Sequence, residues 1–137
     1  MRGSPPFFIP DSCVVDVRNL AAARNWYKEK LSLQESYDRR EDDSGRPFAD
    51  LCLSKHDTAC FSLVELEPGA SPENRHNILY SKKLEKALQW LAARGVSVEA
   101  ITTDSGGNRL FRFYDLDENA IEVCVEPGWQ VALAVCG

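Results

Sequence analysis

The chain has 137 residues, of which 44% are hydrophobic and 27% are charged, and its formal net charge at pH 7 is -5. A chain of this length and composition is expected to form a single globular domain with one core, spanning 1–137. The negative charge argues against nucleic acid and anionic membranes as partners, because both bind basic surfaces.

The N-terminal segment MRGSPPFFIP is interrupted by prolines, and it is expected to be neither a signal peptide nor a membrane anchor. No stretch reaches the ~20 apolar residues of a membrane-spanning helix. The cysteines are odd in number, form no C-x-x-C pair and lie mostly in apolar stretches, which predicts reduced, buried thiols rather than disulfides or a zinc framework. They are Cys13, Cys52, Cys60, Cys124 and Cys136. Together these features predict a cytoplasmic protein.

The first half of the chain is predicted to form a strand, a helix and three further strands. SCVVDV (12–17) is the first strand. Apolar side chains then recur at helical spacing through 19–33, with Asn19 placed to cap the first turn. The later strands are expected at 33–38, 48–54 and 59–66.

The second half repeats this order after EPGASPENR, whose Pro, Gly and Ser residues predict a linker. A strand is expected at 76–81 and a helix at 81–95, with Ser81 as its N-cap and Gly95 as its end. Three more strands are predicted at 96–102, 109–115 and 120–126.

A constant offset of 64 residues relates the two halves. It aligns Ser12 with His76 and Trp26 with Trp90, which predicts an internal repeat of two modules. The resulting boundaries are about 10–67 for the first module, 68–75 for the linker, 76–127 for the second module and 128–137 for a C-terminal tail.

Three segments of this repeat resemble motifs of the vicinal oxygen chelate superfamily, which holds glyoxalases, bleomycin resistance proteins and extradiol dioxygenases. Residues 14–33 and 76–96 are similar to its strand-and-helix units, and 111–123 to its "F…DPDGN.IE" hairpin. The resemblance implies an α+β fold in which two βαβββ modules form an open, barrel-like sheet of eight strands, with a small-molecule site inside the cup. The chain departs from the pattern at KLSL and DLDEN, where the family usually has KLGL and DPDGN.

Metal-dependent members of that family take one ligand from the first strand and one from the last strand of each module. By position, the second module offers His76 and Glu122, whereas the first has Ser12 and Ser62. Serine hydroxyls are poor ligands for Zn²⁺ or Fe²⁺ beside imidazole and carboxylate. Glu65 lies an odd step beyond Ser62 and is expected on the other face of its strand. The site is therefore expected to be incomplete: either no cofactor binds, or His76 and Glu122 hold a divalent metal (Zn, Ni, Mn or Fe).

Alternation along the strands predicts which polar side chains face the cup, because the apolar ones between them belong under the helices. His76 and Glu122 have an alternative interpretation, in which each is an ordinary exposed strand residue with no role in a ligand or metal site. The expected ligand-binding residues are Ser12, Asp16, Ser62, Arg112, Tyr114 and Glu122. Arginine, phenol and carboxylate side chains favour a small polar or aromatic ligand with hydroxyl or acid groups.

Three functions fit this sequence. The first is metal-free small-molecule binding of the bleomycin-resistance type. The second is a metal-dependent enzyme, either a glyoxalase-like lyase or isomerase or an extradiol-type dioxygenase, with Glu122 as a ligand. The third is a protein whose cup is vestigial and which acts by association alone. Whichever function holds, a homodimer is a candidate assembly. The missing first-module ligands favour the first function.

Overall fold

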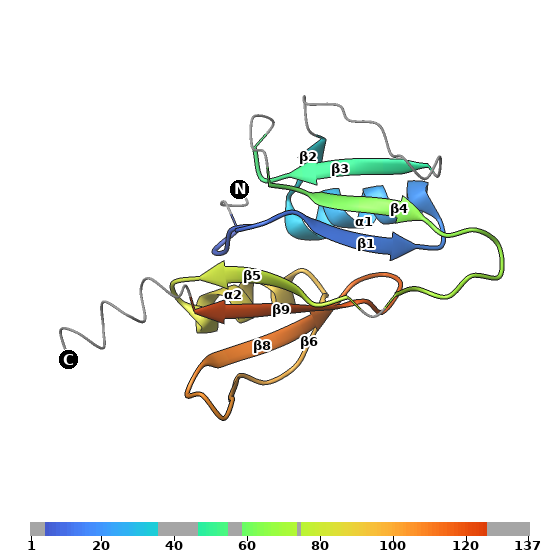
Figure 1. The fold of residues 1–137 in the computed structure, drawn as a ribbon. Coiled ribbons are helices and arrows are strands. Elements are labelled where there is room, and N and C mark those ends of the chain that lie inside the picture. Colours follow the sequence, from blue (N-terminus) through green and yellow to red (C-terminus); the bar gives the residue numbers. More distant parts are fainter. Residues whose placement is uncertain (1–4, 36–46, 55–58, 74, 126–137) are drawn as a thin grey trace.

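The computed structural model describes residues 5–35, 47–54, 59–73 and 75–125 (Figure 1). The first module holds β1 (Cys13–Val17), α1 (Leu20–Leu31), β2 (Gln34–Glu35), β3 (Phe48–Cys52) and β4 (Phe61–Glu65). The second module holds β5 (Asn77–Ser81), α2 (Leu84–Ala93), β6 (Ser97–Val98), β7 (Thr102–Thr103), β8 (Arg109–Tyr114) and β9 (Ala120–Val125). No described helix has the length and apolar character needed to cross a membrane.

The predicted α+β fold with two βαβββ modules is confirmed. The strand order is β1-β4-β3-β2 in one sheet and β5-β9-β8-β6 in the other, with β7 also paired to β8. In both modules the first strand runs parallel to the last one, and the remaining strands are antiparallel. Strands β1 and β5 lie side by side where the modules meet, and the two sheets form an open, unclosed barrel (Figure 1).

The strand predicted at 96–102 is divided into β6 and β7. Val98 pairs with Phe113 and Thr102 pairs with Leu110, so three residues on one strand face two on the other. One extra residue of this kind is a β-bulge, which interrupts the ladder and bends the strand.

The helices begin and end largely where the sequence indicates. The side chain of Asn19 accepts a hydrogen bond from the backbone N–H of Ala22 at 3.0 Å, so the predicted cap of α1 is confirmed. The cap predicted for α2 is wrong: Ser81 is the last residue of β5, and the N-cap position is taken by Lys83, whose side chain makes no capping bond. The Ser81 hydroxyl instead donates to the carbonyl of Pro6 at 2.6 Å and fixes the N-terminal segment against the strand.

Two of the residues that differ from the family pattern have a left-handed backbone conformation. Ser32 has φ 55° and Glu118 has φ 65°, and these are the positions at which KLGL and DPDGN carry glycine. Glycine adopts this conformation without a Cβ penalty, which explains the family preference. At Ser32 a tertiary contact offsets part of the penalty, because Nη2 of Arg94 donates to the Ser32 hydroxyl at 2.7 Å.

The core lies between the sheets and the two helices, on the far side of the sheets in Figure 1. Helix α1 contributes its buried Ala23, Tyr27 and Leu31. Helix α2 contributes Leu84, Ala87 and Leu91. These side chains pack on the apolar strand faces, so the opposite strand faces are left to form the cup.

Two contacts hold the modules together across this core. The buried Tyr27 hydroxyl donates to Oδ2 of Asp115, in the β8–β9 turn, at 2.7 Å. Burial first, and the Asp115 carboxylate second, raise the pKa of the Tyr27 hydroxyl well above its ordinary value. Lys30 and Arg94, which differ by the repeat offset of 64, bond reciprocally: Lys30 Nζ donates to the Arg94 carbonyl at 2.8 Å, and Arg94 Nε donates to the Lys30 carbonyl at 3.1 Å. The modules therefore meet about a local two-fold axis.

The prediction that the cysteines are all reduced is wrong for one pair. Cys52 at the end of β3 and Cys60 just before β4 form a disulfide with a Cα–Cα distance of 4.5 Å. The register that pairs Leu51 with Phe61 places these two cysteines opposite each other, which a count of cysteines does not reveal. Cys13 and Cys124 are free thiols, and Cys136 lies outside the described residues.

Candidate functional site

The cup face of the second sheet carries the polar residues that alternation predicts. Arg112 on β8 is directly opposite Glu122 on β9. The residues on either side of each one in sequence face the helices and are almost fully buried: Phe111, Phe113, Ile121 and Val123. The predicted register of both strands is therefore confirmed.

Glu122 is the centre of a polar cluster on this face. The Glu122 side chain is only 9% exposed. Oε1 accepts a hydrogen bond from Nη2 of Arg112 at 3.2 Å, and Oε2 lies 3.0 Å from Nε2 of His76. The His76 side chain is 72% exposed, so it covers Glu122 from the solvent side. The guanidinium of Arg112 compensates part of the hydration that the buried carboxylate loses.

The neighbours of this cluster extend it in two directions. The Cys124 thiol lies 3.6 Å from Oε2 of Glu122, and burial, followed by the Glu122 charge, raises the pKa of Cys124 to about 12. The thiol is therefore protonated and acts as a donor to Glu122. On the other side, Arg112 approaches Glu99 at 3.9 Å, and the Tyr114 hydroxyl donates to the same Glu99.

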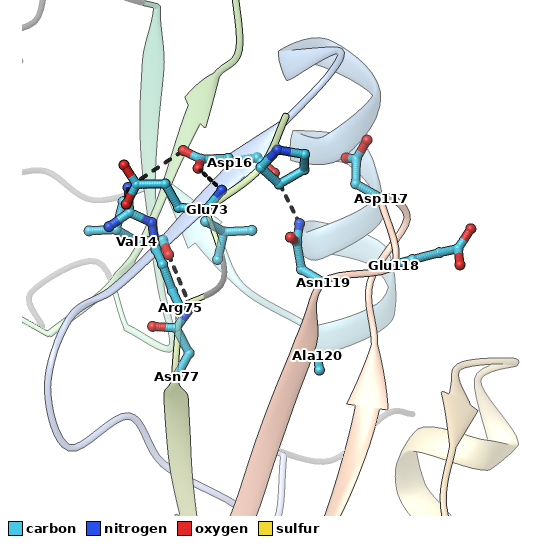
Figure 2. Close-up of a pocket in the computed structure, with 11 residues that line it drawn as sticks. Val14, Asp16, Glu73, Arg75, Asn77, Asp117, Glu118, Asn119 and Ala120 are labelled. Atoms are coloured by element: carbon cyan, nitrogen blue, oxygen red, sulfur yellow. Dashed lines mark hydrogen bonds and ion pairs between the residues drawn. The ribbon is translucent and has the colours of Figure 1, made fainter. Parts of the chain in front are cut away.

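A second polar group surrounds Asp16 at the seam between the modules (Figure 2). Asp16 is 3% exposed because the linker residues run across it. Its Oδ2 accepts a hydrogen bond from the backbone N–H of Glu73 at 2.9 Å, and its Oδ1 lies 3.7 Å from Nη2 of Arg75. Arg75 also approaches the Glu73 carboxylate at 3.2 Å. The side-chain amide of Asn119 donates to the Asp16 carbonyl at 3.0 Å and ties the β8–β9 turn to β1.

Two adjoining cavities open between these groups. A cavity of about 280 Å³ lies beside Glu122, His76 and Arg112, and one of about 270 Å³ lies beside Asp16. Both are lined by Arg75, Asn77 and Ala120, so they are two lobes of one cup. Together they have the size of a small-molecule site.

The predicted site residues are only partly brought together. Asp16, Arg112 and Glu122 line the two lobes. Ser12 is exposed just before β1 and accepts a 3.3 Å bond from the Cys60 N–H, and the buried Ser62 donates to Asp50 at 2.6 Å. Ser12, Ser62 and Tyr114 line neither lobe, and a ligand-binding role for each stays a prediction.

The structure adds residues that the sequence did not single out. They come from the linker, the first residue of β5 and the β8–β9 turn: Glu73, Arg75, Asn77, Asp117 and Asn119. The family-like DLDEN motif marks the turn, but no periodic pattern marks the linker. As predicted, Glu65 is on the other face of its strand, where it accepts a hydrogen bond from the Leu20 N–H at 2.9 Å at the start of α1.

The side chains present do not fit a metal centre of the family type. His76 and Glu122 are the two residues that can hold a metal, and no group of three or more His, Cys, Asp or Glu side chains converges among the described residues. Catalytic zinc normally takes three protein ligands. In addition, the guanidinium of Arg112 already lies against Oε1 of Glu122, and a second cation on the same carboxylate would be repelled by it.

Comparison with solved structures confirms the fold. A glyoxalase family protein from Enterococcus faecalis has a TM-score of 0.62 at 18% identity, covering 82% of this chain and 94% of its own. A member of the glyoxalase/bleomycin resistance protein/dioxygenase superfamily from Sphaerobacter thermophilus has a TM-score of 0.63 at 20% identity, covering 85% and 95%. The fosfomycin resistance protein FosX from Mesorhizobium loti has a TM-score of 0.56 at 13% identity, covering 89% and 95%.

No curated protein matches this chain in sequence. The profile of the glyoxalase/bleomycin resistance protein/dioxygenase superfamily, however, matches residues 9–123. This match includes the first module, all but the end of the second, and every residue of the two cavity lobes. The chain belongs to the glyoxalase/bleomycin resistance protein/dioxygenase superfamily.

Proposed function

We propose that this protein binds a small polar ligand in its cup directly through side chains, with no metal between protein and ligand. The observation that carries this proposal is the contact between Arg112 and the buried Glu122. The pair presents guanidinium donors and a carboxylate acceptor side by side at one cavity. Such a pair suits a ligand that carries an acid group for Arg112 and a hydroxyl group for Glu122.

A metal-dependent lyase, isomerase or dioxygenase is the second candidate function. It is favoured by the 3.0 Å approach of His76 Nε2 to Glu122 Oε2, because these residues occupy the second-module positions at which metal-dependent members have ligands. This function requires a third ligand and the departure of Arg112 from Glu122. The direct-binding function requires neither change, and for that reason we rank it first.

The first experiment follows ligand binding by ¹⁵N-resolved NMR, with glycolate as the probe because it combines an acid and a hydroxyl group. We expect glycolate to shift the amide signals of 75–77 and 120–122. Arg112→Met should weaken binding about tenfold or more, since it removes a charge-assisted contact of about 1.5–3 kcal/mol. Arg109→Met is the matched control. Arg109 is on the same strand but on the other face, where it pairs with Glu85, and this variant should bind as the unmodified protein does. Equal weakening in both variants, or shifts away from the cup, would contradict the proposal.

The second experiment measures metal content. After dialysis against buffer with each of Zn²⁺, Ni²⁺, Mn²⁺ and Fe²⁺, we expect far less than one metal per chain. Within the described part of the chain no three ligating side chains converge, and Glu122 is already paired with Arg112. Elemental analysis of the dialysed protein gives the result directly. About one metal per chain, lost in His76→Ala, would instead establish the metal-dependent function.

A further inference from the structure

The lobe beside Asp16 differs in charge from the lobe beside Glu122. Its lining carries four carboxylates (Asp16, Glu73, Asp117 and Glu118) and one arginine, Arg75. Arg18 also approaches Asp117 at 3.7 Å, so four acids and two arginines leave an excess of two negative charges. The pKa of Asp117 is raised, first by burial and also by the nearby Asp115 charge, which agrees with a surplus of negative charge at this end of the cup.

Two buried polar atoms in this lobe have no hydrogen-bond partner. Oδ1 of Asp16 and Nε of Arg75 are both unsatisfied among the described residues. The nearest approach between these side chains, 3.7 Å from Oδ1 to Nη2, is an ion pair that is too long for a hydrogen bond. One orphaned acceptor and one orphaned donor therefore lie together at the same cavity (Figure 2). Buried polar groups are nearly always paired in folded proteins, so each such exception needs an explanation.

Arg75, in the linker, can break its ion pair with Asp16 and keep another one. Its guanidinium is 3.2 Å from the exposed Glu73 carboxylate as well, so it keeps one ion pair when it moves away from the other. Asp16, in contrast, is held in place, because its Oδ2 accepts the Glu73 N–H and its carbonyl accepts the Asn119 amide. Arg75 is thus the movable group of the pair, and the Asp16 carboxylate is the fixed one.

We propose that this lobe binds the ammonium group of a small amine on Asp16, with Arg75 donating its Nε–H to a hydroxyl or ether oxygen next to that amine. The ammonium takes the position of the Arg75 guanidinium, satisfies Oδ1 and offsets the surplus negative charge. This inference rests on the proposed function, since it names the chemistry of one end of the ligand that the cup would bind. The other end would reach the Arg112–Glu122 lobe past the shared Asn77 and Ala120.

Ethanolamine is the probe, because it is a cation at neutral pH and carries a hydroxyl two carbons from the ammonium. Ethylene glycol has the same size without the charge, and glycolate has the opposite charge. By ¹⁵N-resolved NMR we expect ethanolamine to shift the Glu73 backbone amide and the Asn77 and Asn119 side-chain amides, with a dissociation constant on the order of 1–10 mM for so small a ligand. Ethylene glycol should shift them at least tenfold more weakly.

The matched variants locate the cation. Asp16→Asn should weaken ethanolamine binding about tenfold, and Asp117→Asn, which keeps an oxygen for the Arg18 N–H, about threefold. Glu29→Gln makes the same change of charge on the exposed side of α1 and should leave binding unchanged. If Asp16→Asn does not fold, the Asp117→Asn and Glu29→Gln pair still tests the charge dependence.

Equal shifts with ethanolamine and ethylene glycol, or unchanged binding in both Asp16→Asn and Asp117→Asn, would overturn the inference. The two proposals fail separately. Glycolate binding that depends on Arg112, without ethanolamine binding, leaves the proposed function intact and removes only the amine site. Ethanolamine binding that depends on Asp16, without glycolate binding that depends on Arg112, leaves the amine site intact and removes the proposed function of the Arg112–Glu122 pair.

Discussion

Replacing Asp115 by alanine should cost about 3–5 kcal/mol of unfolding free energy, a large part of the ~5–15 kcal/mol that holds a domain of this size together. The buried Asp115 carboxylate accepts four hydrogen bonds: from the Tyr27 hydroxyl, from the backbone N–H groups of Asp117 and Asn119, and from the Asn119 side chain. Alanine leaves these donors unpaired in the interior, and each unpaired donor carries a desolvation cost. Urea denaturation monitored by circular dichroism gives the value.

Asp104→Ala is the matched control for this effect. Asp104 has the same role in the β7–β8 turn, where it accepts from the Gly106 and Asn108 N–H groups at 2.9 Å, but this turn is exposed and water can take over the donors. We expect a loss below about 1 kcal/mol there. Tyr27→Phe, which removes one of the four donors to Asp115, should fall between the two variants. A cost at Asp115 no larger than at Asp104 would show that the turn does not join the modules.

Reduction of the Cys52–Cys60 disulfide should destabilise the protein by about 2–3 kcal/mol. The bond closes a loop between residues eight positions apart, and a cross-link of this span restricts the unfolded chain by about that amount. The measurement is a urea titration with and without a phosphine reductant. Cys13→Ser, which changes a free and buried thiol, is the control. Reduction should lower its free energy of unfolding by the same amount as that of the unmodified protein.

A thiol count tests the same disulfide independently. Five cysteines less the bonded pair leave at most three thiols to titrate in denatured, unreduced protein, and reductant should raise the count to five. Five thiols before reduction would contradict the disulfide. In the folded protein the two described free thiols should react slowly, because burial raises the pKa of Cys13 to about 11 and of Cys124 to about 12 and thiolates are the reactive form.

The sequence was most informative where a regular pattern and a buried face coincide. The faces of Arg112 and Glu122 followed from the two-residue period of strands whose other side chains, such as Phe113 and Ile121, had to lie under a helix. A one-residue error would have exchanged the faces, so a confirmed register places every strand residue at once. The repeat offset similarly placed His76 at the beginning of the second module, where it precedes β5 and lies 3.0 Å from Glu122.

The sequence was least informative where contacts join irregular segments. Arg75 and Glu73 lie in a linker without periodicity, and their positions depend on how the chain crosses Asp16 on its way between modules. The Cys52–Cys60 pair depends on the register of β3 against β4, and the intervening KHDT turn (55–58) lies outside the described residues. No local rule determines either contact, because each is fixed by the packing of both modules.

The reciprocal bonds between Lys30 and Arg94 have the form of an isologous interface, in which the same patch meets itself across a two-fold axis. In a homodimer, every substitution at such an interface occurs twice, so each residue must suit both copies at the same time. Joining the halves in one chain removes this constraint. Position 30 can therefore be lysine while position 94 is arginine. In the same way, Ser12 can occupy the position of the first half that corresponds to His76 in the second. The second half can then carry His76 and Glu122 while the corresponding positions of the first half carry serine.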